Sequence, residues 1–455
     1  MNKQSEFTQK LTEAGEKGIR TVDLQFVDIF GNIKFKTVSF DEFLHEKEYL
    51  KGYGVDGSSI SGYGVPVEES DLVIMPDPDT FRILPWARDV SRVICDVRTP
   101  PSQDGESVFA GDSRSVLKRV LSGIPDVVRG RGPLTEGEDV TFQYHVAPEL
   151  EFFVLDRERN MVDDLGYFDA PTPGMRAFLT ETMEAMNEMG IRYEVYHHEV
   201  APSQFEFDFR YGEALEIADA TVTLKDIIRN YAEQNELIAT FMPKPFFGMN
   251  GSGMHCHLNL SAYRPAKDGK TQKTNLFYDE AKDSLSDLAL HFIGGLMEHA
   301  RAITAVTNPT CNSYKRLVPG WEAPVNIAWG RKNRTALIRV PYGDPRATRC
   351  EYRSPDPSSN PYLAFAVTLA AGLDGIRREL DPGEATEQDL FHAAASVPML
   401  PGSLEEALDC LQRDTVLCEA LGPHVAHNFL SVKRREACDY RVRPSNVDFD
   451  MYLRV

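Results

Sequence analysis

The sequence predicts an α+β protein built from two domains. Near the N-terminus, two strand-like segments flank a turn, which is typical of a hairpin. The Pro-rich segment TPPSQDG at 99–105 is the strongest candidate for a domain boundary. From about residue 113 the pattern changes to alternating helices and strands. A chain of 455 residues is long enough for two domains or one large one, and the boundary segment favours a small domain over 1–105 and a larger one over 106–455.

Turn residues and the alternation of apolar and polar side chains define the elements expected in the small domain. They are a helix at 5–17, strands at Thr21–Ile29 and Ile33–Val38 around the Gly31-Asn32 turn, a helix at Asp41–Glu48, and a strand at Val90–Val97. Residues 52–66 are expected to form a glycine-rich loop that presents Asp56, Ser58 and Ser59. The loop contains G-x-G-x-x-G, but it follows no strand and its later glycines oppose a helix start. We therefore reject a dinucleotide-binding fingerprint.

Helical spacing of apolar residues dominates the larger domain. Helices are expected at Ser113–Leu121, at Met175–Met189, at Ala214–Thr240 with a break, at Ser284–Ala302, and over most of the tail from Ser403. Two polar stretches interrupt this pattern, a glycine-rich insert at 124–140 and the segment 264–275. We interpret the second as an exposed loop.

Four strands with one apolar and one charged face carry the candidate chemistry. They are Met254–Leu260 with His255, His257 and Asn259, Ala147–Leu155 with Glu149 and Glu151, Phe205–Phe209 with Glu206 and Asp208, and Arg349–Arg353 with Arg349, Glu351 and Arg353. The two histidines would lie about 7 Å apart on their strand, and alone they fit a solvated face equally well. A solvated face usually also includes Lys, Thr and Ser, which these faces lack. The four strands therefore predict a sheet that is apolar behind and charged in front.

The acidic and imidazole side chains of this face indicate a site for divalent metal ions. The candidate ligands are Glu149, Glu151, Glu199, Glu206, His255 and Glu351. Oxygen and nitrogen donors without thiolate suit Mg²⁺ or Mn²⁺ better than a structural zinc. There are more carboxylates than one ion needs, so we expect more than one ion at the site.

Five arginines are candidates for holding phosphates and a substrate carboxylate. They are Arg316, Arg334, Arg339, Arg349 and Arg353. Each one alone fits a surface ion pair better. As a set beside the candidate metal ligands, they favour phosphoryl transfer to an acidic substrate. The sequence contains no GxxxxGK[ST], so a nucleotide would not be held by a P-loop.

Composition excludes several classes of partner. The net charge of −20 disfavours non-specific binding to nucleic acid or to an anionic membrane. Seven cysteines without a CxxC pair suggest reduced thiols in a cytoplasmic protein. The N-terminus lacks the apolar stretch of a signal peptide, and the longest apolar run, near Pro361–Leu373, is too short to span a bilayer.

Eight segments together give the chain a specific family resemblance. They are DGSSI (56–60), ESDLVIMPD (69–77), APELEFF (147–153), HHEVAP (197–202), MPKPFFGMNGSGMHCHL (242–258), NPTCNSYKRLVPGWEAP (308–324), NRTALIRVP (333–341) and EYRSPDPSSNPYLAF (351–365). In this order they resemble the signature segments of type I glutamine synthetase, the glutamate–ammonia ligase. The resemblance implies an N-terminal β-grasp domain and a catalytic α/β domain with a curved antiparallel sheet. It also implies a homo-oligomer, a dodecamer of two hexameric rings, with each active site shared between neighbouring subunits.

The same resemblance implies a role for each matching residue. Glu151, Glu199 and Glu206 match one metal site, and Glu149, His255 and Glu351 match another, so that two or three Mg²⁺ or Mn²⁺ ions act with ATP. His257, Asn259, Arg334, Arg339 and Arg349 match the nucleotide site, and Asn250, Gly251, Arg316 and Arg353 match the glutamate site. Asp56 and Ser59 of a neighbour, with Glu199, match the ammonium site, and Glu322 matches the flap over the intermediate. Asp56, Glu322 and Arg334 would be the catalytic residues.

Several positions depart from the family pattern and bear on the choice of acceptor. Ser203 and Phe205 replace the usual Gly and His or Asn, Trp321 replaces a usual Tyr, and the loop at 61–66 is longer than usual. The expected reaction is ATP-dependent ligation of ammonia to the γ-carboxylate of L-glutamate through γ-glutamyl phosphate. One alternative is a γ-glutamyl ligase that uses an organic amine such as a polyamine or ethanolamine. The other is a non-catalytic, regulatory relative.

Overall fold

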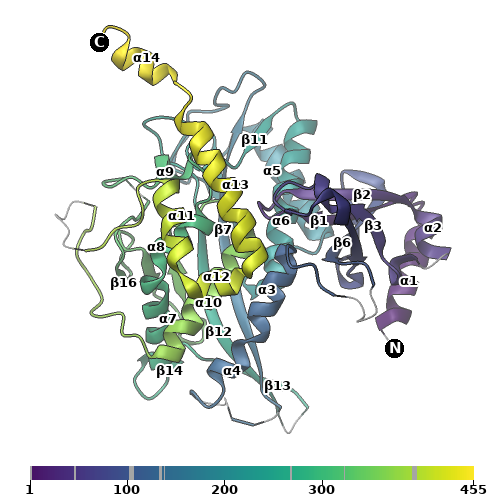
Figure 1. Ribbon diagram of the computed structural model, residues 1–455, viewed down its shortest axis with the longest axis horizontal. Coiled ribbons are helices and arrows are strands. Elements are labelled where there is room, and N and C mark those ends of the chain that lie inside the picture. The colour runs from purple at the N-terminus through teal and green to yellow at the C-terminus, as the bar shows by residue number, and fades with distance from the viewer. Residues whose placement is uncertain are drawn as a thin grey trace.

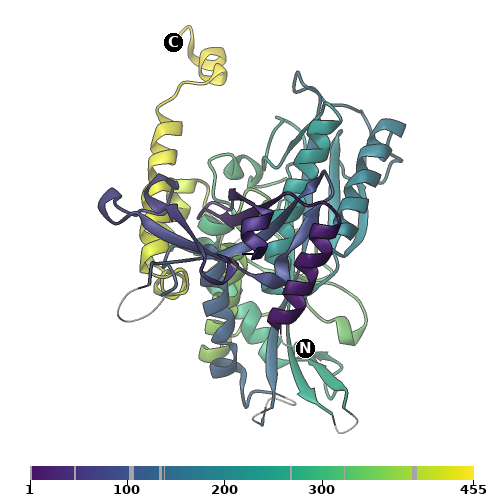
Figure 2. The same cartoon turned by 90° about the vertical axis from the view of Figure 1, so that its right-hand side faces the viewer.

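The computed structural model describes residues 3–45, 48–101, 107–132, 136–137, 139–266, 269–321, 323–391 and 397–455. The N-terminal domain (purple) lies against one side of the larger catalytic domain, and the last helix (yellow) stands away from the body (Figure 1). Seen from the side of the N-terminal domain, the long helix α13 (Pro423–Arg441) runs beside that domain (Figure 2).

The N-terminal domain is a twisted sheet covered by two helices. Its elements are α1 (Lys3–Glu16), β1 (Thr21–Val27), β2 (Ile33–Ser39), α2 (Phe40–His45), β3 (Tyr53–Asp56), β4 (Asp71–Pro76), β5 (Arg82–Leu84) and β6 (Ala87–Arg98). The strand order is β2-β1-β6-β4-β3, and β5 also pairs with β6. The predicted hairpin is confirmed, and Gly31 at its turn has a φ of 81°, which glycine adopts without strain. The first part of the expected 52–66 loop is instead the edge strand β3, which ends at Asp56.

A buried arginine joins the two domains. Arg114, in α3 (Ser113–Ser122), places its guanidinium 2.7 Å from Asp96 and 2.8 Å from Asp77 of the N-terminal domain. The same group lies 2.9 Å from Asp219 in α6 (Ala214–Gln234). Removing one partner from such a buried network would leave an uncompensated charge, so the network fixes the N-terminal domain against the catalytic one. The expected boundary segment overlaps residues 102–106, which lie outside the described part of the chain.

A ten-stranded sheet forms the centre of the catalytic domain. Its strands are β7 (Thr141–Leu155), β8 (Tyr193–His198), β9 (Gln204–Phe209), β10 (Gly212–Glu213), β11 (Ile238–Thr240), β12 (Met254–Pro265), β13 (Thr271–Asn275), β16 (Trp329–Arg331), β17 (Ile338–Val340) and β18 (Cys350–Tyr352). The main order is β16-β17-β18-β12-β7-β9-β8, and all pairs are antiparallel except β16 with β17. The sheet is curled, as expected for this fold class. β14 (Tyr278–Asp279) and β15 (Ser284–Leu285) form a separate small ribbon.

Helices cover the apolar side of this sheet. Besides α3 and α6, the helices of this domain are α4 (Ile124–Val128), α5 (Pro173–Glu188), α7 (Asp287–Glu298), α8 (Ala300–Thr307), α9 (Ser313–Arg316), α10 (Pro361–Arg378), α11 (Leu404–Arg413), α12 (Thr415–Leu421), α13 (Pro423–Arg441) and α14 (Asn446–Tyr452). Of these, α14 stands away from the sheet and buries none of its residues. Almost every residue of α10 is buried, and this helix packs against α3, α6, α7 and α8. Within the described residues, every helix is too short or too polar to cross a membrane.

Three further expectations about local structure are wrong. The segment 264–275 is largely a hairpin, because β12 continues to Pro265 and β13 pairs with it; its backbone is bonded although most of its side chains face water. The insert at 124–140 begins with α4, which buries Ile124 and Val128. The single helix expected over 284–302 is interrupted at His299, whose ring lies between Asp374 (3.1 Å) and Asp414 (2.6 Å).

Candidate active site

A cavity of about 810 Å³ opens on the charged face of the large sheet. It is lined by eleven of the residues expected from the sequence: Glu149, Glu151, Glu199, Glu206, Asn250, Gly251, His255, Arg316, Arg334, Arg339 and Arg353. These residues come from strands and loops that are distant in the sequence. Their convergence in one cavity is the pattern typical of a site that binds a charged small molecule.

A second cavity of about 440 Å³ adjoins the first, and Glu149 and Asp208 line both. The expected nucleotide residues His257, Asn259 and Arg349 line this second cavity. The two cavities therefore meet at the carboxylates of β7 and β9. A group transferred from one bound molecule to another could cross at this point.

Strand register explains why these side chains meet. Across β12 and β7, His255 is opposite Glu149, and across β7 and β9, Glu151 is opposite Glu206. On the other side of β12, His257 is opposite Glu351. Opposite residues of an antiparallel pair share a face, so one register places the whole set in front of the sheet.

Glu149 is held by both histidines of β12. His255 Nδ1 lies 3.0 Å from one carboxylate oxygen and His257 Nε2 lies 2.7 Å from the other. The other ring nitrogen of His257, Nδ1, lies 3.1 Å from the Arg349 guanidinium. Burial favours a higher pKa for Glu149, but the hydrogen bonds of His255 and His257 outweigh it and hold that pKa well below its usual range.

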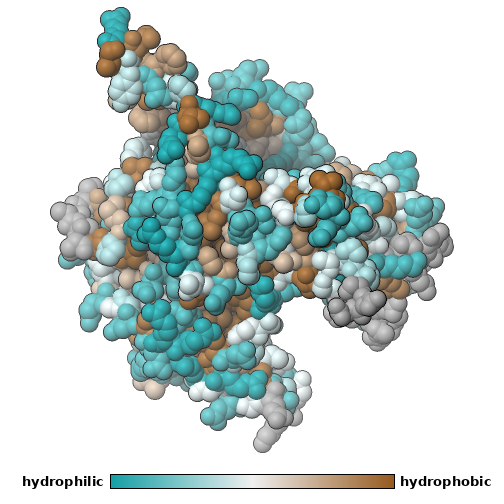
Figure 3. Space-filling view, in the orientation of Figure 1, coloured by the Kyte–Doolittle hydropathy of each residue, from teal (hydrophilic) through white to brown (hydrophobic). Residues whose placement is uncertain are grey.

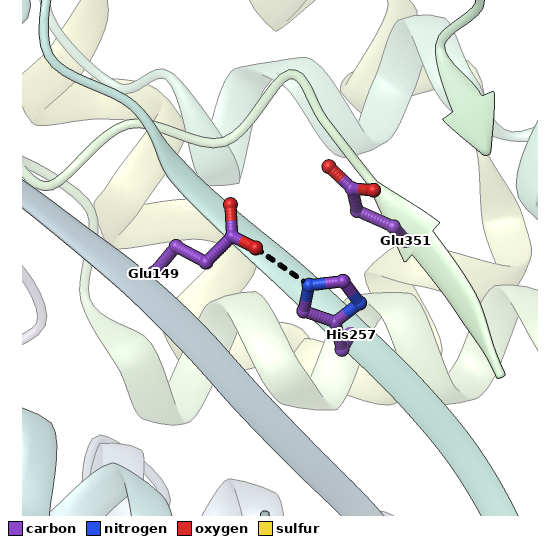
Figure 4. Close-up of side chains that lie close together, drawn as sticks. All are labelled: Glu149, His257 and Glu351. Carbon is purple, nitrogen blue, oxygen red and sulfur yellow. Dashed lines mark hydrogen bonds and ion pairs between the residues drawn. The ribbon is translucent and has the colours of Figure 1, made fainter. Parts of the chain in front are cut away.

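The first group of possible metal ligands is Glu149, His257 and Glu351, which come from three adjacent strands (Figure 4). Each offers one ligand atom, and these atoms all lie within 4.8 Å of one another. His255, which was expected in this group, has Nδ1 3.6 Å from Glu351. Burial favours a higher pKa for Glu351, but the charge of His257 and that of Arg353 lower the pKa below its usual value.

The second group of possible metal ligands lies around Glu206, where several carboxylates are close together. His197 Nε2 is 3.1 Å from Glu206, and His197, Glu206 and Asp208 offer ligand atoms within 4.8 Å of one another. Burial, together with the negative charges of Glu151 and other nearby carboxylates, raises the pKa of Glu206 well above its usual value. A divalent cation would relieve this repulsion and restore the charged form. The donor set of the cavity therefore fits Mg²⁺ or Mn²⁺.

Two arginines are oriented by Glu351. Arg339 donates to one oxygen at 2.6 Å and Arg353 to the other at 2.9 Å, while Arg353 also bonds the backbone oxygen of Arg334. The buried Arg316 donates to the backbone oxygen of Ser354 at 2.7 Å. These contacts hold guanidinium groups in fixed positions along the cavity wall.

The glycines of the loop before β12 allow close packing at the cavity floor. A Cβ on Gly251 would lie 2.3 Å from the backbone oxygen of Pro243. A Cβ on Gly253 would lie 2.6 Å from Arg316 and 2.9 Å from Glu151, whose carboxylate accepts the Gly253 N–H at 2.9 Å. Side chains at either position would displace the groups that form the cavity.

The expected ammonium residues are not all brought together within one chain. Glu199 lines the cavity, whereas Asp56 and Ser59 lie on the N-terminal domain and do not line it. Hydrogen bonds from Ser58 and Ser59, both 2.7 Å long, lower the pKa of Asp56 to about 2. Glu322 lies outside the described residues, although its neighbour Trp321 lines the cavity.

Two of the departures from the family pattern have a local structural explanation. Ser203 has a φ of 62°, a conformation that favours glycine, and its hydroxyl accepts hydrogen bonds from the backbone of Val162 (2.7 Å) and Asp163 (3.1 Å). These bonds offset the strain. Phe205 is buried on the opposite face of the sheet from the cavity, so it does not touch the site.

Sequence reasoning missed several side chains that line the cavities. The ring centres of Tyr167 and Phe168 lie 4.1 Å apart, and both rings line the cavity with Glu199, in a segment whose sequence has no periodicity to reveal them. His145 lines the second cavity beside Lys273, and burial together with Lys273 lowers its pKa to about 4. Extending the alternation of β7 toward its N-terminal end would have found His145, because it shares a face with Glu149.

Comparisons with known proteins support the assignment of this site. Residues 18–100 match the family model described as the glutamine synthetase beta-Grasp domain, and residues 111–452 match the glutamine synthetase catalytic domain. Glutamine synthetases of Methanococcus voltae and Thermotoga maritima are each 42% identical, and each alignment covers 96% of this chain and 97% of the relative. A solved structure of GmaS with ADP is 31% identical with a TM-score of 0.84, and covers 98% of this chain and 99% of its own.

Proposed function

The chain belongs to the glutamine synthetase family, and from that premise we propose that it ligates ammonia to the γ-carboxylate of L-glutamate, converting ATP to ADP and phosphate. The observation that carries the proposal is the meeting of two cavities at Glu149, with possible metal ligands and arginines around the junction. A non-catalytic relative would have no need for this complete set of charged groups.

In this proposal ATP occupies the second cavity with its phosphates toward Glu149 and His257. The exposed ring of Tyr211 and the guanidinium of Arg349 line that cavity and suit a base and a phosphate chain. Two or three Mg²⁺ or Mn²⁺ ions would be held by Glu151, Glu199 and Glu206 and by Glu149, His255 and Glu351, with His257 beside them. Such ions supply Lewis acidity and offset phosphate charge.

Glutamate occupies the first cavity in this proposal. Arg316, Arg353, Asn250 and Gly251 would hold its backbone groups and leave the γ-carboxylate toward the junction. An oxygen of that carboxylate attacks the γ-phosphorus of ATP, ADP leaves, and γ-glutamyl phosphate forms. Arg334 and Arg339 would offset the charge that builds on the transferring phosphoryl group, and Arg349 would hold the nucleotide phosphates.

Ammonia then displaces phosphate from the acyl carbon. Glu199, with Asp56 and Ser59 of a neighbouring subunit, would bind ammonium, and Asp56 would take the proton that frees ammonia. A carboxyl group with a pKa near 2 binds a cation well but accepts a proton poorly. Weaker bonds from Ser58 and Ser59 in the shared site would raise this pKa and favour the proton transfer. Glu322 would close over the intermediate and keep water out.

One specific observation favours a second candidate acceptor, a small organic amine. Tyr167, Phe168 and Trp321 place aromatic rings in the same cavity as Glu199. Ring faces attract alkylammonium groups, and they also fill space that a larger amine would need. The similar GmaS structures are of γ-glutamylmethylamide synthetase, a ligase of this kind.

The acceptor is tested by comparing kcat/KM for ammonium, methylamine, ethanolamine, putrescine and spermidine under the same ATP and glutamate concentrations. We expect ammonium to have the highest value, because the four acceptor-site groups Asp56, Ser59, Glu199 and Glu322 offer charge and acceptors to a small cation. A higher value for methylamine would make the protein a γ-glutamyl–amine ligase. A higher value for a polyamine would overturn both candidates and direct attention to the 61–66 loop.

We further propose a dodecamer of two hexameric rings. The absence of Asp56 from the cavity of its own chain supports a site completed by a neighbour. Helix α14 also stands away from the body with apolar side chains on its surface (Figure 3). Phe449, Met451 and Leu453 are 59%, 63% and 73% exposed, which a stable monomer rarely tolerates on one short segment.

Substitutions in α14 and at Leu453, which follows it directly, test this assembly. Phe449→Glu and Leu453→Glu are expected to reduce the sedimenting mass, because they place charge where apolar surface would be buried against another copy. Asp450→Ala, on the same helix, is the matched control and is expected to assemble normally. Unchanged mass in both glutamate variants would exclude α14 from the interface.

A further inference from the structure

Another pocket lies between the two domains, away from the catalytic cavity. It is a cleft of about 610 Å³. Its walls are the β1–β2 turn at Phe30–Asn32, residues of α6 and α13, and the segment 240–243. The helix α13 runs beside the N-terminal domain in Figures 1 and 2. None of the residues assigned above to metal, ATP, glutamate or ammonium lines this cleft.

The charged groups in the cleft wall are mostly cationic. Lys225, Arg229 and Lys433 line it, and Glu436 is the one carboxylate among the lining residues within the described chain. This excess of positive charge is local, because the whole chain carries a net charge of −20. A positive cleft on an acidic protein concentrates small anions.

Arg229 is the cation best placed to bind a ligand. Its guanidinium stacks 5.0 Å from the ring centre of Phe241, and the described residues give it no hydrogen bond. The opposing charge that acts on it is that of Asp226, one turn away on α6, which does not line the cleft. The planar donor array of Arg229 is therefore free to pair with the two oxygens of a carboxylate or phosphate.

Two buried lysines complete the cationic wall. Lys433 is paired with Glu436 at 2.7 Å and lies 4.9 Å from the ring of Phe30. Lys225 donates to the backbone oxygens of Pro357 and Ser359. Burial, followed by the charge of Arg229, lowers the pKa of Lys225 to about 7, and a bound anion would favour its charged form.

From this arrangement we propose that the interdomain cleft binds a small, multiply charged anion through carboxylate or phosphate oxygens, with Arg229, Lys225 and Lys433 as its contacts. The site is separate from the catalytic one but adjacent to it. Asn312 lines the cleft and holds the backbone of Lys244, accepting its N–H at 2.8 Å and donating to its oxygen at 3.0 Å. Lys244 in turn lines the catalytic cavity.

Calorimetric titration of the full-length protein tests the proposal, with saturating ADP and glutamate present to fill the catalytic site. Inorganic phosphate and succinate are the two probes, and the tighter one identifies the preferred oxygen group. We expect Arg229→Gln to weaken binding by about tenfold, through loss of a charge-assisted pair. Glu436→Gln should tighten binding, because it frees Lys433 from its opposing carboxylate.

Arg435→Gln is the matched control, because it removes an exposed arginine from α13 outside the cleft. It is expected to bind the probe as the natural protein does. Failure of both probes to bind, or equal affinity in Arg229→Gln and Arg435→Gln, would overturn the proposal. A Glu436→Gln variant that binds no more tightly than the natural protein would also overturn the proposal. The expected result for this variant is a gain of affinity, which a destabilised protein could not produce.

Discussion

Replacing Glu151 or Glu206 by alanine is expected to abolish ATP-dependent phosphate release, with a loss on the order of 10³-fold or more. Glu151 is buried and accepts hydrogen bonds from Gln204 at 3.0 Å and from the Gly253 N–H at 2.9 Å. The raised pKa of Glu206 reflects carboxylates whose repulsion a cation would relieve. Loss of either carboxylate removes a metal ligand and the neutralisation of charge on the phosphates.

Two further variants separate loss of the ion from loss of structure. Glu151→Gln keeps the size of the side chain and removes only the charge, so we expect it to unfold at nearly the natural temperature while remaining inactive. Glu158→Ala removes an exposed carboxylate just after β7 and should keep full activity. Near-full turnover of Glu151→Ala at limiting Mg²⁺ would contradict the metal assignment.

Mixed assemblies of Asp56→Ala and Glu351→Ala subunits are expected to recover activity that neither variant has alone. Asp56 lies in the N-terminal domain outside its own cavity, whereas Glu351 is buried in the cavity wall. If each site combines the loop of one subunit with the wall of the next, random mixing in equal amounts restores about a quarter of the sites. Phosphate release after co-assembly measures the recovery.

The matched control uses two variants of the same wall. Glu151→Ala mixed with Glu351→Ala is expected to stay inactive, because every site in that mixture lacks one wall carboxylate. Co-assembly is verified by carrying a different affinity tag on each variant. No recovery with Asp56→Ala in verified mixed rings would refute a site built between subunits.

Local patterns predicted most of the strands but only part of the helices. The hairpin of β1 and β2 and the strands β7, β9 and β12 follow from turn residues and strict alternation, which are local properties. The β12–β13 hairpin was missed, because its bonds lie in the backbone and its side chains are mostly exposed and polar. The break at His299 was missed because its partners, Asp374 and Asp414, lie on distant helices.

The candidate site was likewise predicted only in part from local patterns. Alternation by itself assigned Glu149, Glu151, His255 and His257 to the charged faces of their strands. Alternation could not pair them, because pairing depends on register between strands far apart in the sequence. Nor could it reveal Tyr167, which reaches the cavity from a segment outside the sheet.

The sequence by itself determined the chemistry of this protein, since the kinds of side chain and their alternation are written in the chain. Acidic, imidazole and guanidinium groups on apolar-backed strands predicted metal ions and phosphates, and the motifs predicted the family. Tertiary structure alone decided which groups meet. It brought His257 and Glu351 to Glu149 through register. It also kept Asp56 out of its own cavity, because the network around Arg114 fixes the N-terminal domain in place.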